Sequence, residues 1–380
     1  MIEIENVENL IKVDCDCNEI IKVNADELTY NQFFHEFMFK NVPVIIKNVD
    51  LLTPAATTWF TENKFNIDKF EDVLKDLDVP VYNNSKQYFN SHEKTTMKFK
   101  DYAEYWRLDE KKELLYLKDF HLKQQLPELD FYNVPEFFAS DWLNECLIDK
   151  ASDDYRFVYI GVKGTWTPLH SDVFNSYSWS GNVCGKKQWL MIVPGEEDKL
   201  KDNFGQLPMS IDSNLLKEKN VKFFEIIQEP NEILFVPSKW FHQVLNLTDV
   251  FSINHNWFNS CNIHEIKDSL FKNWNDVVAE IQDCKNMYDF DNHCQLMTKS
   301  LFGMDFKDFV DILIHVGTKR RKFIKSNEHF KLFAKFDVGR NLAEYDDQMI
   351  DEILKEILDV YVNFLSDSLI QTILSYLHAD

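Results

Sequence analysis

The chain has little glycine, little proline and little positive charge for its length. Only 9 glycines and 10 prolines occur in 380 residues, which argues against a fibrous or a disordered chain. Lysine and arginine number 41 against 63 aspartates and glutamates, so the formal net charge is −22. Such acidity is a general route to solubility. It also disfavours direct binding to nucleic acid and favours a basic protein as the partner.

The spacing of the cysteines and the length of the apolar runs indicate in which cellular compartment the protein is expected. The seven cysteines are scattered, and the one close pair, Cys15 and Cys17, has no second pair with which to form a zinc site. An odd number without regular spacing suggests reduced thiols. The N-terminus has no apolar signal-peptide region, and no apolar run is long enough to span a membrane. We therefore expect a cytoplasmic protein without a membrane segment, with the nucleus as the alternative.

Aromatic and β-branched residues are abundant, and many of them fall in short runs. Hydrophobic residues make up 45% of the chain, including 32 Phe, 14 Tyr and 9 Trp. Short strands separated by turns are typical of a double-sheet jelly roll rather than a parallel sheet. We therefore predict a mainly β core, a double-stranded β-helix or jelly-roll cupin, with flanking helices. The predicted strands are 41–47, 79–82, 114–117, 155–162, 177–184, 187–193, 222–227, 233–236, 243–247 and 250–257.

Helical periodicity precedes and follows this β-rich part. Apolar residues recur at helical spacing in the stretches 27–40, 53–76, 98–109, 263–281, 304–316 and 350–365. Residues 83–96 are polar and predict a loop. These patterns divide the chain into an N-terminal arm (1–27), a domain at 28–262 with its β core at about 114–258, and a C-terminal helical domain (263–380).

Two features of the C-terminal part have more than one interpretation. Its apolar stripes pack either on each other or against a second copy, so a homodimer through these helices is an alternative to a monomer. The basic cluster Lys319–Lys322 predicts a solvated helix end, with a nuclear import signal as the alternative.

One stretch carries a histidine and a carboxylate two residues apart, His170 and Asp172. In a strand, residues i and i+2 point to the same face, so these side chains can meet at one point. They make up two thirds of a facial triad for non-haem Fe(II). His242 follows an apolar run that predicts a buried strand, and it is available as the third ligand. A second triplet, His378–Asp380, lacks this context.

A lysine next to an apolar strand is the second feature that predicts a ligand. Lys187 lies at the start of the run Trp189–Val193, and an inward-facing ammonium needs an anionic partner because burying it unpaired is costly. Lys186 should then face outward. A register slip of one residue would exchange the two lysines.

Four segments together resemble the JmjC oxygenases, which depend on Fe(II) and 2-oxoglutarate. The pairing of Asp172–Trp179 with Ser252–Trp257 is similar to the small JmjC lysyl hydroxylases in particular. The motifs extend over about Tyr116 to Trp257 and are specific in combination. The four segments are Thr167–Asp172, Gly185–Trp189, Phe235–His242 and Ser252–Trp257.

The resemblance assigns roles to individual residues. It implies that His170, Asp172 and His242 hold the iron, and that the 28–262 domain is the JmjC catalytic domain. It also implies that the remaining matched residues surround 2-oxoglutarate, with the first three on its 5-carboxylate: Lys187, Tyr116, Thr167, Asn254 and Asn256. Ser180 stands where many relatives carry an asparagine.

The reaction that this resemblance implies consumes O2 and 2-oxoglutarate, with ascorbate as reductant, and hydroxylates a lysine side-chain carbon of a translation release factor. One alternative is a histone or protein N-methyl-lysine demethylase, which the absence of a zinc-binding cysteine cluster disfavours. Aromatic residues close to the motif, Phe174, Tyr177 and Trp179, leave a pocket for a methylated ammonium open. A non-catalytic cupin scaffold is the second alternative, and the intact ligand set disfavours it.

Overall fold

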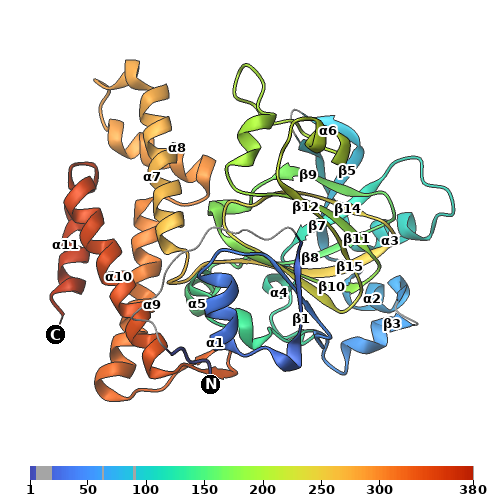
Figure 1. Ribbon diagram of the computed structural model, residues 1–380, viewed down its shortest axis with the longest axis horizontal. Coiled ribbons are helices and arrows are strands. Elements are labelled where there is room, and N and C mark those ends of the chain that lie inside the picture. Colours follow the sequence, from blue (N-terminus) through green and yellow to red (C-terminus); the bar gives the residue numbers. More distant parts are fainter. Residues whose placement is uncertain (6–18, 62–63, 89–90, 380) are drawn as a thin grey trace.

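Two sheets form the centre of the molecule (Figure 1). The computed structural model describes residues 1–5, 19–61, 64–88 and 91–379. The larger sheet is ordered β1 (Ile21–Asn24), β2 (Val44–Lys47), β13 (Glu232–Val236), β10 (Tyr177–Cys184), β15 (Val250–Trp257), β8 (Arg156–Gly161), β7 (Leu115–Phe120), β5 (Asp78–Tyr88) and β6 (Ser91–Lys98). The smaller sheet is ordered β12 (Phe223–Gln228), β11 (Lys187–Ile192), β14 (Phe241–Asn246) and β9 (Trp166–His170).

The strands β8 to β15 are antiparallel to their neighbours in this core. This arrangement confirms the predicted jelly-roll core with flanking helices. Strand β15 shows how the sequence separates its two faces: Ser252, Asn254 and Asn256 alternate with Phe251, Ile253, His255 and Trp257. The polar row faces the smaller sheet, since Ser252 bonds to a side chain from β11.

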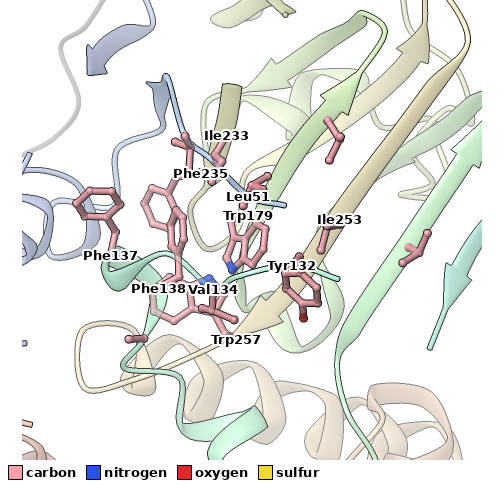
Figure 2. Close-up of a cluster of buried hydrophobic side chains, with 14 of the residues drawn as sticks. Leu51, Tyr132, Val134, Phe137, Phe138, Trp179, Ile233, Phe235, Ile253 and Trp257 are labelled. Atoms are coloured by element: carbon pink, nitrogen blue, oxygen red, sulfur yellow. The ribbon is translucent and has the colours of Figure 1, made fainter. Parts of the chain in front are cut away.

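The opposite face of the larger sheet is covered by aromatic side chains (Figure 2). The segment from Tyr132 to Phe138 crosses this face, and the ring of Phe138 stacks on Trp179 with centroids 5.3 Å apart. Trp257 and Phe235 complete this group. The larger sheet therefore has one apolar face, which packs into the hydrophobic core, and one polar face, which is available to bind ligands.

Short helices surround the β core. Helix α1 (Tyr30–Phe33) begins with a capping box from Thr29 and continues as a π-helical turn through Met38. Asp141 accepts a bond from the Asn144 backbone N–H at the start of α5, as an N-cap side chain does. The others are α2 (Ile67–Leu74), α3 (Phe99–Arg107), α4 (Leu122–Gln125), α5 (Trp142–Asp149) and α6 (Ser213–Glu218).

The C-terminal part is helical and gathers on one side of the sheets, where Figure 1 colours it from orange to red. It contains α7 (Ile263–Glu280), α8 (Phe290–Phe302), α9 (Phe306–Ser326), α10 (Arg340–Tyr361) and α11 (Asp367–Leu377), with a small hairpin of β16 (Lys331–Leu332) and β17 (Phe336–Asp337). These helices share one hydrophobic cluster with Trp142 of α5 and with Phe174. No helix in the described ranges is both long and apolar enough to cross a membrane.

Two local predictions are wrong. The stretch 53–76 is not one helix. In its described residues, 53–61 and 64–76, a 3₁₀ turn (Ala56–Trp59) and α2 are the helical parts, and the paired strands β3 (Phe60–Thr61) and β4 (Lys64–Phe65) lie between them. Its aromatic rings pack onto Phe251 of β15 instead of forming one helical stripe. The polar stretch 83–96 is not a loop, because most of it forms the β5–β6 hairpin at the edge of the larger sheet.

The basic cluster Lys319–Lys322 is not a solvated helix end. It lies within α9, where Arg320 is fully buried and donates to Glu145 of α5 at 2.8 and 2.9 Å and to Asp346 of α10 at 3.0 Å. Lys319 also pairs with Glu145. Buried charges need such partners, so the cluster fastens α9 to two other helices and is engaged rather than free. The Cys15–Cys17 pair lies outside the described residues.

Candidate iron and cosubstrate site

A cavity of about 260 Å³ lies at the polar face of the larger sheet. All eight residues that the sequence suggested for the site line it: Tyr116, Thr167, His170, Asp172, Lys187, His242, Asn254 and Asn256. They come from β7, β9, β11, β14, β15 and the turn after β9. The fold therefore brings together residues that are separated by up to 140 positions.

Three side chains converge at one end of this cavity. His170 ends β9, and His242 lies opposite it on β14, with ring centroids 4.3 Å apart. One ligand atom from each of His170, Asp172 and His242 lies within 4.8 Å of the other two. The i+2 spacing predicted Asp172 on the same strand as His170, but β9 ends at His170 and Asp172 lies after it. Asp172 lies directly before the 3₁₀ turn Val173–Asn175, and its carboxylate lies near the two histidines from that position.

The hydrogen bonds of the two histidines suit a metal ion. The Nδ1 of His170 lies 2.8 Å from the carbonyl of Pro168, and that of His242 lies 2.9 Å from the carbonyl of Trp240. A carbonyl only accepts, so each Nδ1 carries a proton, and in the neutral imidazole Nε2 is then the nitrogen with a free lone pair. Burial and the neighbouring His242 lower the pKa of His170, which also favours the neutral form that binds metals.

The carboxylate of Asp172 is held from the sheet behind it. The hydroxyl of Ser178, on β10, donates to its Oδ2 at 2.7 Å. Such a bond fixes the orientation of the carboxylate before a metal arrives. Two imidazoles and one carboxylate, with solvent-accessible space beside them, match the ligand set of non-haem Fe(II) oxygenases.

At the other end of the cavity lies a buried lysine. Lys187 is 2% exposed, and its Nζ donates to Ser252 at 2.6 Å. Among the described residues, no carboxylate lies within salt-bridge distance of this Nζ, and burial lowers the pKa of Lys187 to about 7. Lys186 points outward and pairs with Glu229, so the strand register is the one the sequence predicted. A buried ammonium without a counter-ion is suited to an anionic ligand.

Comparison with known proteins identifies the family. Residues 157–257 match the family described as "JmjC domain, hydroxylase". The chain is 39% identical to the "2-oxoglutarate and iron-dependent oxygenase JMJD4 homolog" of Drosophila melanogaster, over 93% of this chain and 91% of that protein. It is 37% identical to "2-oxoglutarate and iron-dependent oxygenase JMJD4" of Homo sapiens, over 82% of this chain and 80% of that protein. The chain belongs to the JMJD4 family.

Members of the JMJD4 family carry iron and 2-oxoglutarate dependence in their names, and this chain is an oxygenase of that class. A plant relative bears a different name. "Arginine-specific demethylase JMJ20" of Arabidopsis thaliana is 36% identical over 77% of this chain and 68% of that protein. The scaffold alternative therefore has no support, whereas the choice of substrate differs among the names of the relatives.

Hydroxyl and amide groups line the wall of the JMJD4-type cavity. Burial raises the pKa of the Tyr116 phenol, so Tyr116 stays a neutral donor. Ser180 is not among the residues that line the cavity, but its hydroxyl donates to Oδ1 of Asn254, its neighbour across the β10–β15 pair, at 3.2 Å. The amide of Asn256 donates to Ser176 at 3.2 Å. Ser180 thus contributes to the cavity indirectly, by orienting the side-chain amide of Asn254.

Several cavity residues were missed by the sequence reasoning. Lys118 and Asp119 follow Tyr116 on β7, and both line the cavity although neighbours on a strand normally face opposite ways. The reason is that Asp119 has a left-handed backbone, with φ of 56°, and the strand pairing is irregular there. No sequence pattern marks such a position. Tyr159 and Ser178 lie at alternating positions on predicted strands, so inward alternation was the signal that was available.

The aromatic residues expected at the site lie elsewhere. Tyr177 and Trp179 belong to the hydrophobic cluster on the far face of the larger sheet, and Phe174 packs against the C-terminal helices. They lie on the same strand or turn as site residues, but their side chains point away from the cavity. The rings that do line the cavity are Tyr116, Phe157, Tyr159 and Trp189.

Proposed function

We propose that this JMJD4-family oxygenase hydroxylates a side-chain carbon of an unmodified lysine in a translation release factor. His170, Asp172 and His242 hold the iron. Lys187, Tyr116 and Thr167 bind the 5-carboxylate of 2-oxoglutarate, and Asn254 and Asn256 lie beside it. When bound, iron and 2-oxoglutarate supply the oxidising power that converts a substrate C–H bond into an alcohol. The chain's own residues then decide which carbon is presented.

The observation that favours a cationic side chain as the target is the carboxylate of Asp119. Burial raises its pKa, but Lys118 and the hydroxyls of Tyr159 and Tyr82 outweigh this and hold the pKa of Asp119 below its ordinary value. Tyr159 donates to it at 2.7 Å. An ionised carboxylate in the same cavity as the iron ligands is a partner for the ammonium of a lysine.

A groove next to the cavity favours a polypeptide over a small metabolite. Its volume is about 500 Å³, and Ser171, between the two neighbouring iron ligands, lines both the cavity and the groove. Helix α7 forms one wall, including Ser269, Lys272 and Asn273. Among the described residues, no group hydrogen-bonds to the buried Oδ1 of Asn273. Because that oxygen is buried, a substrate does not reach it, and the volume of the groove and its continuity with the cavity at Ser171 are what favour an extended substrate.

A demethylase remains the second candidate, since one relative is named an arginine-specific demethylase. Phe157 and Tyr159 line the cavity, and aromatic rings bind methylated cations. Geometry separates the two reactions. Oxidation of a methylene gives a stable alcohol, whereas oxidation of an N-methyl group gives a product that loses formaldehyde.

The deciding experiment measures the product mass. The protein is incubated with Fe(II), ascorbate, 2-oxoglutarate and a release-factor domain, and modified peptides are located by tandem mass spectrometry. We expect a gain of one oxygen on an unmodified lysine, and none with His170→Ala or Asp172→Ala. Formaldehyde from methylated peptides, without oxygen gain on any unmodified lysine, would replace this proposal by the demethylase.

The role of Asp119 has its own test. Asp119→Asn removes the charge but keeps the size, so the KM for the protein substrate should rise roughly tenfold, as expected when a hydrogen bond to a charged group is lost. The KM for 2-oxoglutarate should stay unchanged. The matched control is Asp109→Asn, an exposed carboxylate before β7. Equal substrate KM values in the two variants would show that Asp119 does not contact the substrate.

A further inference from the structure

The turn that carries Asp172 has an unfavourable backbone conformation. Phe174 has φ of 61° and ψ of 4°, and Asn175 has φ of 53°. Two successive non-glycine residues are thus left-handed, which is uncommon for asparagine and a genuine outlier for a bulky residue such as phenylalanine. Such strain persists only where surrounding contacts hold it. The turn's own bonds are two, from the N–H of Asn175 to the carbonyl of Asp172 at 3.0 Å and from Ser176 to Val173 at 2.9 Å.

The first outside contact comes from helix α7. The side-chain amide of Asn175 donates to the hydroxyl of Ser269 at 2.8 Å. Ser269 lies in the second turn of α7, 94 positions along the chain from Asn175. The bond therefore joins the ligand-bearing turn of the β core directly to the C-terminal helical part.

The second outside contact comes from the end of helix α8. The ring of Phe174 is 3% exposed and lies against the ring of Phe302, with centroids 5.5 Å apart, and against Tyr155 at 5.2 Å. Gly303, which follows α8, has φ of 100° and leaves room for this ring. A Cβ at Gly303 would lie 2.7 Å from Cε1 of Phe174. Phe302 and Gly303 at the end of α8 thus both pack against Phe174, which lies two residues after Asp172.

We propose that the C-terminal helices position the iron ligand Asp172 by clamping Phe174 and Asn175. Ser269, Phe302 and Gly303 are positioning residues, because they act on the carboxylate only through the turn. Without the clamp, the strained turn relaxes, and the carboxylate of Asp172 leaves the point at which the two histidines converge. This inference rests on the proposed role of Asp172 as a ligand.

The test uses Co(II) bound to the purified full-length protein without 2-oxoglutarate or substrate. The visible spectrum of Co(II) reports the number and geometry of its ligands, and a titration gives its affinity. Ser269→Ala removes the hydroxyl, and Asn175→Gly removes the amide while keeping a residue that adopts positive φ freely. Each should weaken Co(II) binding roughly three- to tenfold, the effect of losing about one hydrogen bond. The double variant should be no worse than either single variant.

Matched controls separate this effect from general damage. Lys272→Ala lies on the same helix and lines the same groove, and it should leave Co(II) affinity unchanged. Gly303→Ala should displace Phe174 and weaken Co(II) binding. Gly205→Ala also places alanine at a positive φ, of 77°, but nothing lies within 4 Å of its Cβ, so it should not weaken binding.

Two outcomes are distinguishable failures. If Asp172→Ala binds Co(II) as tightly as the parent, the ligand assignment itself is wrong. If Asp172→Ala loses binding while Ser269→Ala, Asn175→Gly and Gly303→Ala keep the parental affinity and spectrum, the clamp has no positioning role. Should Gly303→Ala not fold, Ser269→Ala decides, because it removes one hydroxyl from a partly exposed position.

Discussion

Lys187 is the residue on which binding of 2-oxoglutarate is expected to depend most. Its ammonium is buried beside Ser252 without a carboxylate partner among the described residues. Lys187→Ala should raise the KM for 2-oxoglutarate roughly tenfold or more, because a hydrogen bond to a charged group contributes about 1.5–3 kcal/mol. The matched control is Lys186→Ala, whose side chain points outward to Glu229. Initial rates at varied 2-oxoglutarate measure both. A larger effect in Lys186→Ala would contradict the assignment.

The same lysine makes cosubstrate binding depend on pH. Burial lowers the pKa of Lys187 to about 7, and a bound dianion raises it again because it stabilises the ammonium. Above pH 7 the free protein therefore has to take up a proton on binding, and the dissociation constant should rise by up to about tenfold per pH unit. Titrations between pH 6 and 9 measure it. Lys187→Arg keeps its charge and should show a flat profile; a flat profile in the parent would contradict this linkage.

At the residue scale, the sequence predicted side chains whose chemistry is specific and whose spacing is regular. His170, His242 and Lys187 lie on strands, where alternation determines the facing. Asp119 was missed because a left-handed residue on an irregular strand reverses that facing. Asp172 reaches the site through a turn rather than through the strand. Such positions depend on contacts between distant parts of the chain, which a single sequence does not display.

Among the elements, helix α9 is joined to two other helices by a buried ion-pair cluster. Arg320 is 0% exposed and bonds to Glu145 and Asp346 from two other helices. Arg320→Met leaves the buried Asp346 without its cationic partner and leaves Glu145 with Lys319 alone, so the free energy of unfolding should fall by about 3–5 kcal/mol. Denaturant titration measures this. Lys322→Met, an exposed neighbour on the same helix, should change little, and equal stability of the two variants would contradict a structural role for the cluster.

Element boundaries were predictable where hydrophobic alternation was strong. Strands β10 and β15 begin and end where the sequence pattern placed them. The β5–β6 hairpin was missed because its outer part is mostly exposed and polar. Its strands are joined by backbone pairing and by polar contacts such as Lys86 with Glu93, so they show no apolar period. At residues 319–322 a solvated surface was predicted where Arg320 is buried. A basic run indicates a solvated surface only when no acidic side chains lie opposite it.

For the whole molecule, the assembly state is open to direct measurement. The division at residue 263 and a homodimer through the C-terminal helices stay predictions. Tyr288, Leu296 and Leu301, at and before α8, are 96%, 67% and 67% exposed, so substitutions at these positions test whether α8 contacts a second copy. Light scattering distinguishes the two states: a monomer gives the chain mass and a homodimer gives twice that mass, and Leu296→Glu with Leu301→Glu should convert such a dimer to the monomer. A parental monomer at micromolar concentration would contradict the dimer.

The net charge of −22 should act on the encounter with a basic substrate rather than on the chemical step. Opposite charges speed association, and salt screens them over a Debye length of about 10 Å at 0.1 M. The kcat/KM for a basic release-factor domain should therefore fall as ionic strength rises, whereas kcat at saturating substrate should stay level, because the complex has already formed. The control is a release-factor variant with its basic residues neutralised, whose kcat/KM should be lower at low salt and nearly independent of salt. A decrease in kcat that parallels kcat/KM would place the salt effect in the active-site cavity instead of on the surface.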